Sequence, residues 1–288
     1  MSKENSKFKI VQKIINNIKK GFIFSQDLLD SSMLIPNNPI TGTYYKGYNR
    51  IYLSFVFIEE GYNSNKWITY KQAKCKNLKP KVPLKGRGKT LEKFLFKEDE
   101  ITGKVIPIRK YFTVFNIDLF NGTEKYLKSG FNNTPSDIAV ELYNNSLCEI
   151  KTSNTPVPYY NFVADYINLP PYDCFANDLS FIHVMLHEMI HSTGHVSRLN
   201  RSLWKNDKES YAIEEIIAEF GAIFTSAELG LKLDTNLEHS CSNYILSYFK
   251  ELDSEKVKKF IKALKMAETA SEFLIKRKIE KLERNITK

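Results

Sequence analysis

Cysteine is scarce in this sequence and is never paired. The four cysteines, Cys75, Cys148, Cys174 and Cys241, are spread over 288 residues, and none belongs to a Cys-x-x-Cys motif. Isolated cysteines exclude a disulfide framework and a thiolate zinc site as the basis of the fold. We therefore expect all four to be buried, reduced thiols.

Long apolar runs are also missing. No stretch approaches the roughly 18 uninterrupted apolar residues of a membrane span, and residues 1–21 are polar and basic, without the apolar segment of a secretory signal. Hydrophobic residues nevertheless make up 42% of the chain, which is enough for one large domain or two smaller ones. The sequence predicts a soluble, cytoplasmic protein with no membrane partner.

Acidic residues are too few to balance the cations in the first part of the chain. The formal net charge of +9 divides into +13 for residues 1–130 and −4 for residues 131–288. Residues 71–89 contain eight cations and no acidic residue. This uneven distribution indicates that the two parts have different partners.

Hydrophobic periodicity predicts an α+β fold, with a basic α+β N-terminal part and a mostly helical C-terminal part. Helices are expected over residues 10–18, 69–76, 137–143, 178–193, 211–224 and around 242–252. Strands are expected over residues 50–58, 90–97, 105–117 and 161–169, with a hairpin turn at Thr102-Gly103. The boundary between the two parts falls near residues 121–133.

Residues 181–191, FIHVMLHEMIH, are apolar apart from three histidines and one glutamate, so this helix should be buried and its polar groups need partners. His187 and His191 lie one turn apart on one face, which lets both imidazoles reach a single Zn²⁺. Glu188 could then serve as general base toward a water whose pKa zinc lowers to roughly 7. The alternative is that the histidines only form hydrogen bonds in a core, which we favour for His183.

A second apolar helix, residues 211–224 (YAIEEIIAEFGAIF), contains three glutamates. Glu215 and Glu219 share a face at four-residue spacing, whereas Glu214 suits a solvent-facing position. Together with the His-Glu-x-x-His motif, this helix resembles that of the thermolysin-like gluzincins. The resemblance implies that Glu215 is the third metal ligand and that Glu219, in place of the usual Asp, accepts an imidazole N–H. Glu214 and Glu219 remain alternatives for the third ligand. A metzincin would require a histidine where Ser197 stands.

The whole chain resembles the ArdC-type antirestriction proteins, in which a domain that binds single-stranded DNA precedes a zincin metallopeptidase domain. The matching segments are PITGTYYKGYNRIYL (39–53), WITYKQAK (67–74), YFTVFNID (111–118), DYINLPPYDCF (165–175) and HEMIHSTGHVSRLNR (187–201). The resemblance implies a DNA-binding domain over residues 1–128, a zincin-like domain over residues 129–288, a Zn²⁺ cofactor and a protein substrate that the sequence does not name. His195, Arg198 and Arg201 match family positions, and one of them could orient a carboxylate or bind an anion. The alternative is that they cap the C-terminus of the helix against its dipole.

The same resemblance gives the basic segment a specific interpretation. Cationic side chains would contact phosphates and aromatic side chains would stack on unpaired bases of single-stranded DNA, with double-stranded DNA as a further candidate partner. The candidate residues are Lys71, Lys74, Lys85, Arg87, Lys89, Trp67 and Tyr70. The alternative is an ordinary lysine-rich surface, with Trp67 and Tyr70 in the core.

The expected function is to protect plasmid or phage DNA from host nucleases, and the attached domain is expected to be a zinc metalloendopeptidase. Two alternatives stay open. The chain could be a DNA-tethered zinc endopeptidase whose main role is to cleave host proteins, or a DNA-coating protein whose zinc domain is purely structural.

Overall fold

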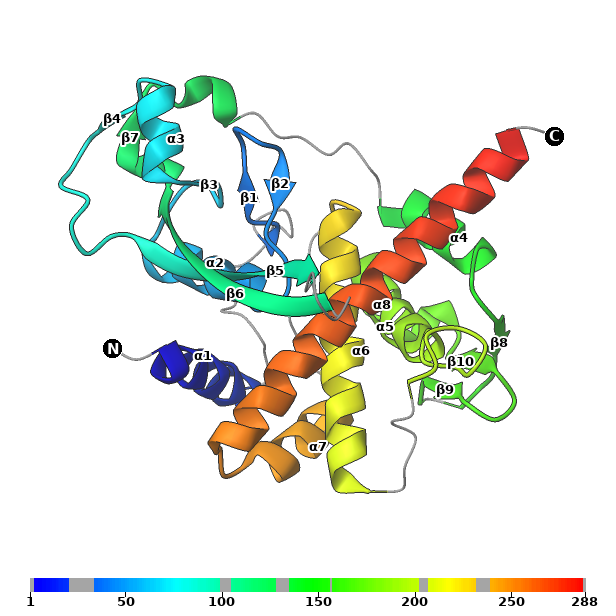
Figure 1. Cartoon of the computed structure of the whole chain (residues 1–288). Coiled ribbons are helices and arrows are strands. Elements are labelled where there is room, and N and C mark those ends of the chain that lie inside the picture. Colours follow the sequence, from blue (N-terminus) through cyan, green and yellow to red (C-terminus); the bar gives the residue numbers. More distant parts are fainter. Residues whose placement is uncertain are drawn as a thin grey trace. The chain divides into compact units, whose positions relative to one another are not determined.

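The chain forms two compact units in a computed structural model, shown in Figure 1. The structure describes residues 3–20, 34–98, 105–127, 135–155, 157–201, 207–231 and 239–286. One unit comprises residues 35–130, and the other combines residues 1–34 with residues 131–288. The expected α+β fold class is confirmed.

The unit of residues 35–130 is built around an antiparallel sheet in the order β3-β6-β5. These strands are β3 (Trp67–Ile68), β5 (Lys89–Glu98) and β6 (Val105–Asn116), so the strands expected over residues 90–97 and 105–117 are confirmed. The turn expected at Thr102-Gly103 lies outside the described residues. Short two-stranded pairs are formed by β1 (Asn37–Asn38) with β2 (Thr43–Tyr44), and by β4 (Lys79–Pro80) with β7 (Phe120–Asn121). Two 3-10 helices, η2 (Ile117–Leu119) and η3 (Glu124–Tyr126), follow β6.

The strand expected over residues 50–58 is wrong, because this segment is helix α2 (Tyr48–Glu59). Its residues are buried on most sides, so the continuous apolar run lacks the polar face that marks a surface helix. A short apolar run of this kind does not distinguish a buried strand from a buried helix. The helix expected over residues 69–76 is confirmed as α3 (Tyr70–Cys75), which the Thr69 side chain caps together with Gln72.

The other unit is mostly helical. It contains α1 (Lys3–Ile18), α4 (Pro135–Asn144), α5 (Asp178–Ser192), α6 (Lys208–Glu228), α7 (His239–Phe249) and α8 (Ser254–Ile286). The helices expected over residues 10–18, 137–143, 178–193 and 211–224 and around 242–252 are therefore confirmed. Helix α1 packs against α7 and α8, so it lies in this unit and not with residues 35–130, where the expected domain of residues 1–128 had placed it.

Helix α8 extends beyond the last helix predicted from the sequence, which was expected around residues 242–252. Its buried residues recur at helical spacing at Phe260, Ala263, Leu264 and Ala267, and this face packs against α6. The helix therefore supports the element that carries the glutamates. None of the helices among the described residues is long and apolar enough to cross a membrane.

A small sheet in the order β8-β10-β9 completes this unit. It contains β8 (Glu149–Thr152), β9 (Tyr159–Asn161) and β10 (Tyr166–Leu169), and the 3-10 helix η4 (Tyr172–Cys174) follows it. The single strand expected over residues 161–169 is thus two strands joined by a turn, where Asp165 has a φ of 50°. The expectation of buried thiols is wrong for Cys75 and Cys174, which are exposed, and Cys148 is only partly buried; the Cys241 side chain lies outside the described part of the chain.

Candidate metal centre

Helix α5 begins at a well-defined cap. The Asn177 side chain accepts a hydrogen bond from the Ser180 amide, and the Ser180 hydroxyl accepts one from the Asn177 amide. From this start, helical periodicity brings His183, His187 and His191 to successive turns of one face. Helix α6, which Asp207 caps, packs against α5 and carries the three glutamates.

Gly221 sets how closely α5 and α6 approach each other. A Cβ atom at this position would lie 2.8 Å from Cγ2 of Ile190, which is fully buried on α5. Glycine is normally unfavourable inside a helix by about 1 kcal/mol relative to alanine. Its place here is explained by the close contact between the two helices that carry the polar cluster.

We expect Gly221→Ala to destabilise the protein by about 1–3 kcal/mol, because the added methyl group overpacks the contact. Chemical denaturation of the wild type, Gly221→Ala, Ile190→Ala and the double variant measures this. Because Ile190→Ala removes all three side-chain atoms that the added methyl group would meet, the double variant should lose less stability than the sum of the two single variants. Stabilisation of Gly221→Ala by the amount typical of a free helix would contradict the packing argument.

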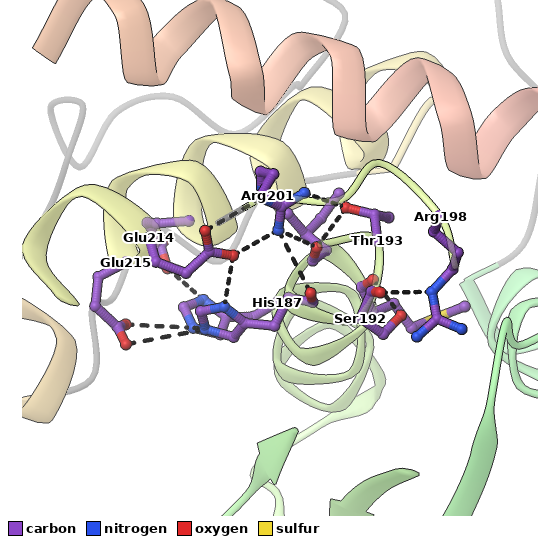
Figure 2. A network of polar contacts seen from close by, with 11 residues as sticks. His187, Ser192, Thr193, Arg198, Arg201, Glu214 and Glu215 are labelled. Carbon is purple, nitrogen blue, oxygen red and sulfur yellow. Dashed lines mark hydrogen bonds and ion pairs between the residues drawn. The ribbon is translucent and has the colours of Figure 1, made fainter. Parts of the chain in front are cut away.

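Three donor groups converge between the helices. Nε2 of His187 lies 3.1 Å from Nε2 of His191 and 3.5 Å from a carboxylate oxygen of Glu215, and Nε2 of His191 lies 3.9 Å from the other oxygen. One donor atom from each of these residues falls within 4.8 Å of the others. Figure 2 shows the Glu215 carboxylate directed at the imidazole nitrogens. The structure thus brings together the three residues predicted as metal ligands.

The other nitrogen of His187 faces a different carboxylate. Its Nδ1 lies 3.2 Å from Oε2 of Glu219, and Oε1 of Glu219 lies 3.1 Å from Nε2 of His183. Burial alone would raise the pKa of Glu219, but the two histidines hold it well below its usual value. Burial would likewise lower the pKa of His187, and the carboxylates of Glu215 and Glu219 raise it well above normal. Glu219 is therefore an ionised anchor for the His187 ring.

Glu214 does not face solvent, contrary to the expectation from sequence. It is 4% exposed, and its Oε1 lies 3.2 Å from Nδ1 of His191. Burial would raise its pKa, but the charges of Arg201 and His191 lower it below the usual value. His187 and His191 thus each have a separate carboxylate at Nδ1: Glu219 contacts His187, and Glu214 contacts His191.

Arg201 fixes the Glu214 carboxylate from behind. Its guanidinium is 6% exposed and binds both carboxylate oxygens, and it also donates to the Thr193 hydroxyl and to the Ile190 carbonyl at the end of α5 (Figure 2). The two roles expected for this arginine, orienting a carboxylate and binding the helix C-terminus, are both present. Gly194 leaves room for it, because a Cβ there would lie 2.9 Å from an Arg201 nitrogen.

Arg198 makes a separate connection between the end of α5 and the small sheet. It donates to the Ser192 carbonyl at 2.6 Å and forms an ion pair with Asp165 in the β9–β10 turn. The Tyr160 hydroxyl on β9 accepts a hydrogen bond from Arg198 and donates one to Asp165. These contacts fix β9 relative to the metal-ligand helix.

Glu188 lies between the two histidines in sequence and is also buried. Its charge is one of those that raise the pKa of His187, which places it within electrostatic reach of that ring. Its role as general base stays a prediction.

The residues predicted to bind DNA divide by exposure. Lys71, Lys74, Lys85 and Arg87 are exposed, and Tyr70 is 54% exposed. Lys89 forms an ion pair with Glu60. Trp67 is wrong as a stacking residue, because it is fully buried and donates its indole N–H to Asn65. The sequence alone does not show whether an aromatic residue beside a basic segment is buried or exposed, so it could not exclude Trp67 as a stacking residue.

Comparison with known proteins also divides the chain into two parts, but the first of them includes α1. Residues 4–115 match the N-terminal domain of anti-restriction factor ArdC, and residues 138–265 match a zincin-like metallopeptidase family. The metal-free crystal structure of antirestriction protein ArdC from plasmid R388 is 32% identical, with a TM-score of 0.74, and the alignment covers 95% of this chain and 98% of that one. The chain belongs to the ArdC-type antirestriction family. Its zincin-like domain implies a bound metal.

Two further relatives extend the comparison. The Mn(II)-bound crystal structure of ArdC from plasmid R388 is 29% identical, with a TM-score of 0.75, and covers 96% of this chain and 98% of that one. DNA primase TraC from Escherichia coli is 29% identical, and the alignment covers 92% of this chain and 26% of TraC. A second TraC sequence is 28% identical, and the matched region is 18% of its length. The ArdC-type chain therefore spans about a quarter or less of these primases.

Proposed function

We propose that His187, His191 and Glu215 bind one zinc ion. A four-coordinate zinc at about 2.0–2.1 Å from each ligand places the ligand atoms roughly 3.3 Å apart. The separations of 3.1, 3.5 and 3.9 Å between the converging atoms lie close to this value. Glu214 and Glu219 instead contact the Nδ1 atoms, on the other side of the rings. This arrangement of donors is the observation that carries the proposal, and it favours Glu215 over the other two glutamates.

The residues around the donors suit hydrolysis of a peptide bond. Bound zinc supplies Lewis acidity, which lowers the pKa of a water toward about 7 and polarises a carbonyl group. Glu188 takes the proton from the attacking water and passes it to the leaving amine. Glu219 and Glu214 accept hydrogen bonds from the Nδ1–H groups, so each imidazole keeps the tautomer that leaves Nε2 available.

Metal content tests the ligand set directly. We expect about one zinc per chain in the wild type and a loss of at least tenfold in zinc affinity in Glu215→Ala and in His187→Ala, since each removes one of three protein ligands. Glu209→Ala is the matched control, because this glutamate is on the same helix but pairs with Lys259. Elemental analysis after dialysis, with competition against a chelator, provides the measurement. Full zinc content without Glu215 would assign the third ligand to Glu214 or Glu219.

Residues 35–130 are proposed to bind single-stranded DNA. The exposed cations of the basic segment, Lys71, Lys74, Lys85 and Arg87, can contact phosphates, which makes the affinity depend on salt. Family membership and the match to the ArdC N-terminal domain support this assignment. Lys89 contributes less, because Glu60 already neutralises part of its charge.

The proposed biological role is protection of plasmid or phage DNA from host nucleases. A nuclease-protection assay on single-stranded DNA with wild type and Glu188→Gln distinguishes two forms of this role. Protection by the wild type that Glu188→Gln loses indicates that cleavage of a protein target is required. Equal protection by both indicates that coating of the DNA is sufficient. Absence of protection by the wild type would contradict the proposed role.

A further inference from the structure

The β5–β6 ribbon carries exposed aromatic rings beyond the point where it leaves the core. Leu91 and Val114, near its base, are buried, whereas Phe94 is 49% exposed and Tyr111 is 47% exposed. Aromatic rings that face solvent on a strand pair need a reason, because burying them elsewhere would be favourable. This ribbon belongs to the unit of residues 35–130, which is proposed to bind single-stranded DNA.

Strand register places these rings on one face. Phe94 pairs with Arg109, and the next pair on the same face is Glu92 with Tyr111. Diagonal neighbours of this kind lie roughly 7–8 Å apart, so the two rings are close without covering each other. Phe94 and Tyr111 thus present two separate aromatic surfaces in one row.

Arg109 holds the row together. Its guanidinium lies 5.4 Å from the centre of the Phe94 ring, and a side-chain hydrogen bond joins it to Tyr111. Glu92 lies 4.0 Å from Arg109, which helps to fix the guanidinium between the rings. A planar guanidinium can itself stack on a base.

The opposite face has a different character. Lys93 and Lys110 are directly paired in the register, and both are exposed. Like charges directly opposite each other destabilise a strand pair. An anion near the ribbon would relieve this repulsion. The neighbouring Leu95 and Ile108 have no ring for a base, and the Phe112 ring on this face is partly buried, with the Lys93 amine 6.0 Å from its centre.

We propose that Phe94, Arg109 and Tyr111 form a stacking platform for unpaired bases of single-stranded DNA on one face of the ribbon, and that the long side chains of Lys93 and Lys110 reach past the ribbon edges from the other face to contact the phosphates. Aromatic rings beside cations are the combination that binds single strands without sequence preference. A base pair buries its faces in the duplex stack, so the platform selects single-stranded over double-stranded DNA. This inference rests on the proposed DNA-binding function and assigns it to the ribbon in addition to the basic segment.

Binding of fluorescent oligothymidine to the full-length protein tests the platform. Each base stacked on an aromatic ring contributes enough that its loss weakens binding by about 5–150-fold. We expect Phe94→Ala/Tyr111→Ala to weaken binding at least tenfold without changing the slope of log affinity against log salt. Tyr44→Ala is the matched control, because Tyr44 is a 56% exposed ring on β2, outside the ribbon. It should change affinity less than twofold.

The charge contribution is separated by salt dependence. Lys93→Ala/Lys110→Ala should flatten the salt slope by up to about 0.7 for each lost phosphate contact. Phe94→Trp should keep full affinity, and the new indole fluorescence should be quenched when oligothymidine binds. Equal binding by wild type and Phe94→Ala/Tyr111→Ala would overturn the platform and leave the DNA-binding function intact. Absence of binding by the wild type would overturn both. Equal loss of duplex binding in the aromatic variant would also contradict stacking on unpaired bases.

Discussion

Replacing Glu188 with glutamine should reduce peptide hydrolysis by a factor of about 10²–10⁴, the usual contribution of a positioned general base. Glutamine has nearly the same shape but accepts no proton. Glu188 is buried, so the glutamine side chain should fill the same space without opening a cavity. The expected result is a lower kcat, with zinc content and DNA affinity unchanged.

Hydrolysis of an unfolded protein substrate by zinc-loaded wild type and Glu188→Gln is the appropriate measurement. Glu209→Gln is a matched control, since it makes the same chemical change at a partly exposed position of α6 that pairs with Lys259. Undiminished hydrolysis by Glu188→Gln would exclude Glu188 as the general base. Lost hydrolysis together with lost zinc would instead place Glu188 in the binding of the metal.

The second large effect is expected at the ion pair between Glu214 and Arg201. Both side chains are buried, and removing one partner of a buried pair leaves an uncompensated charge, at a cost of about 3–5 kcal/mol. Glu214→Ala should therefore lower the melting temperature by roughly 10 °C, taking about 2–4 °C for each kcal/mol in a domain of this size.

A double variant separates the structural role of this pair from its effect on the metal. Replacing both partners of a buried pair with apolar residues is often neutral for stability. Glu214→Leu/Arg201→Met should therefore recover much of the melting temperature. Its zinc affinity should stay about 10–100-fold below that of the wild type, because Nδ1 of His191 has lost its acceptor. Recovery of both quantities would mean that Glu214 acts on folding alone.

Spacing along the helices accounts for the part of the site that was predictable from sequence. His187 and His191 are four residues apart, and so are Glu215 and Glu219, so each pair must share a helix face wherever the helix packs. Only the resemblance to gluzincins, however, suggested that the two faces meet. The structure adds the distances between them.

The role of Glu214, in contrast, could not be predicted from helix spacing. Helix α6 is buried on nearly all sides, so its sequence has no polar face from which to infer which glutamate turns inward. The partner Arg201 lies beyond the end of another helix, and local pattern carries no information about such a contact. The same limit explains α2, whose apolar run resembles a strand, and Trp67, for which the sequence left both a stacking role and a core position open.

X-ray diffraction from crystals of the zinc-loaded protein, recorded at the zinc absorption edge, tests the central claim most directly. We expect one anomalous peak between α5 and α6, about 2.0–2.2 Å from Nε2 of His187, Nε2 of His191 and a carboxylate oxygen of Glu215. A peak within bonding distance of Glu214, of Glu219 or of an Nδ1 atom would contradict the proposed ligand set.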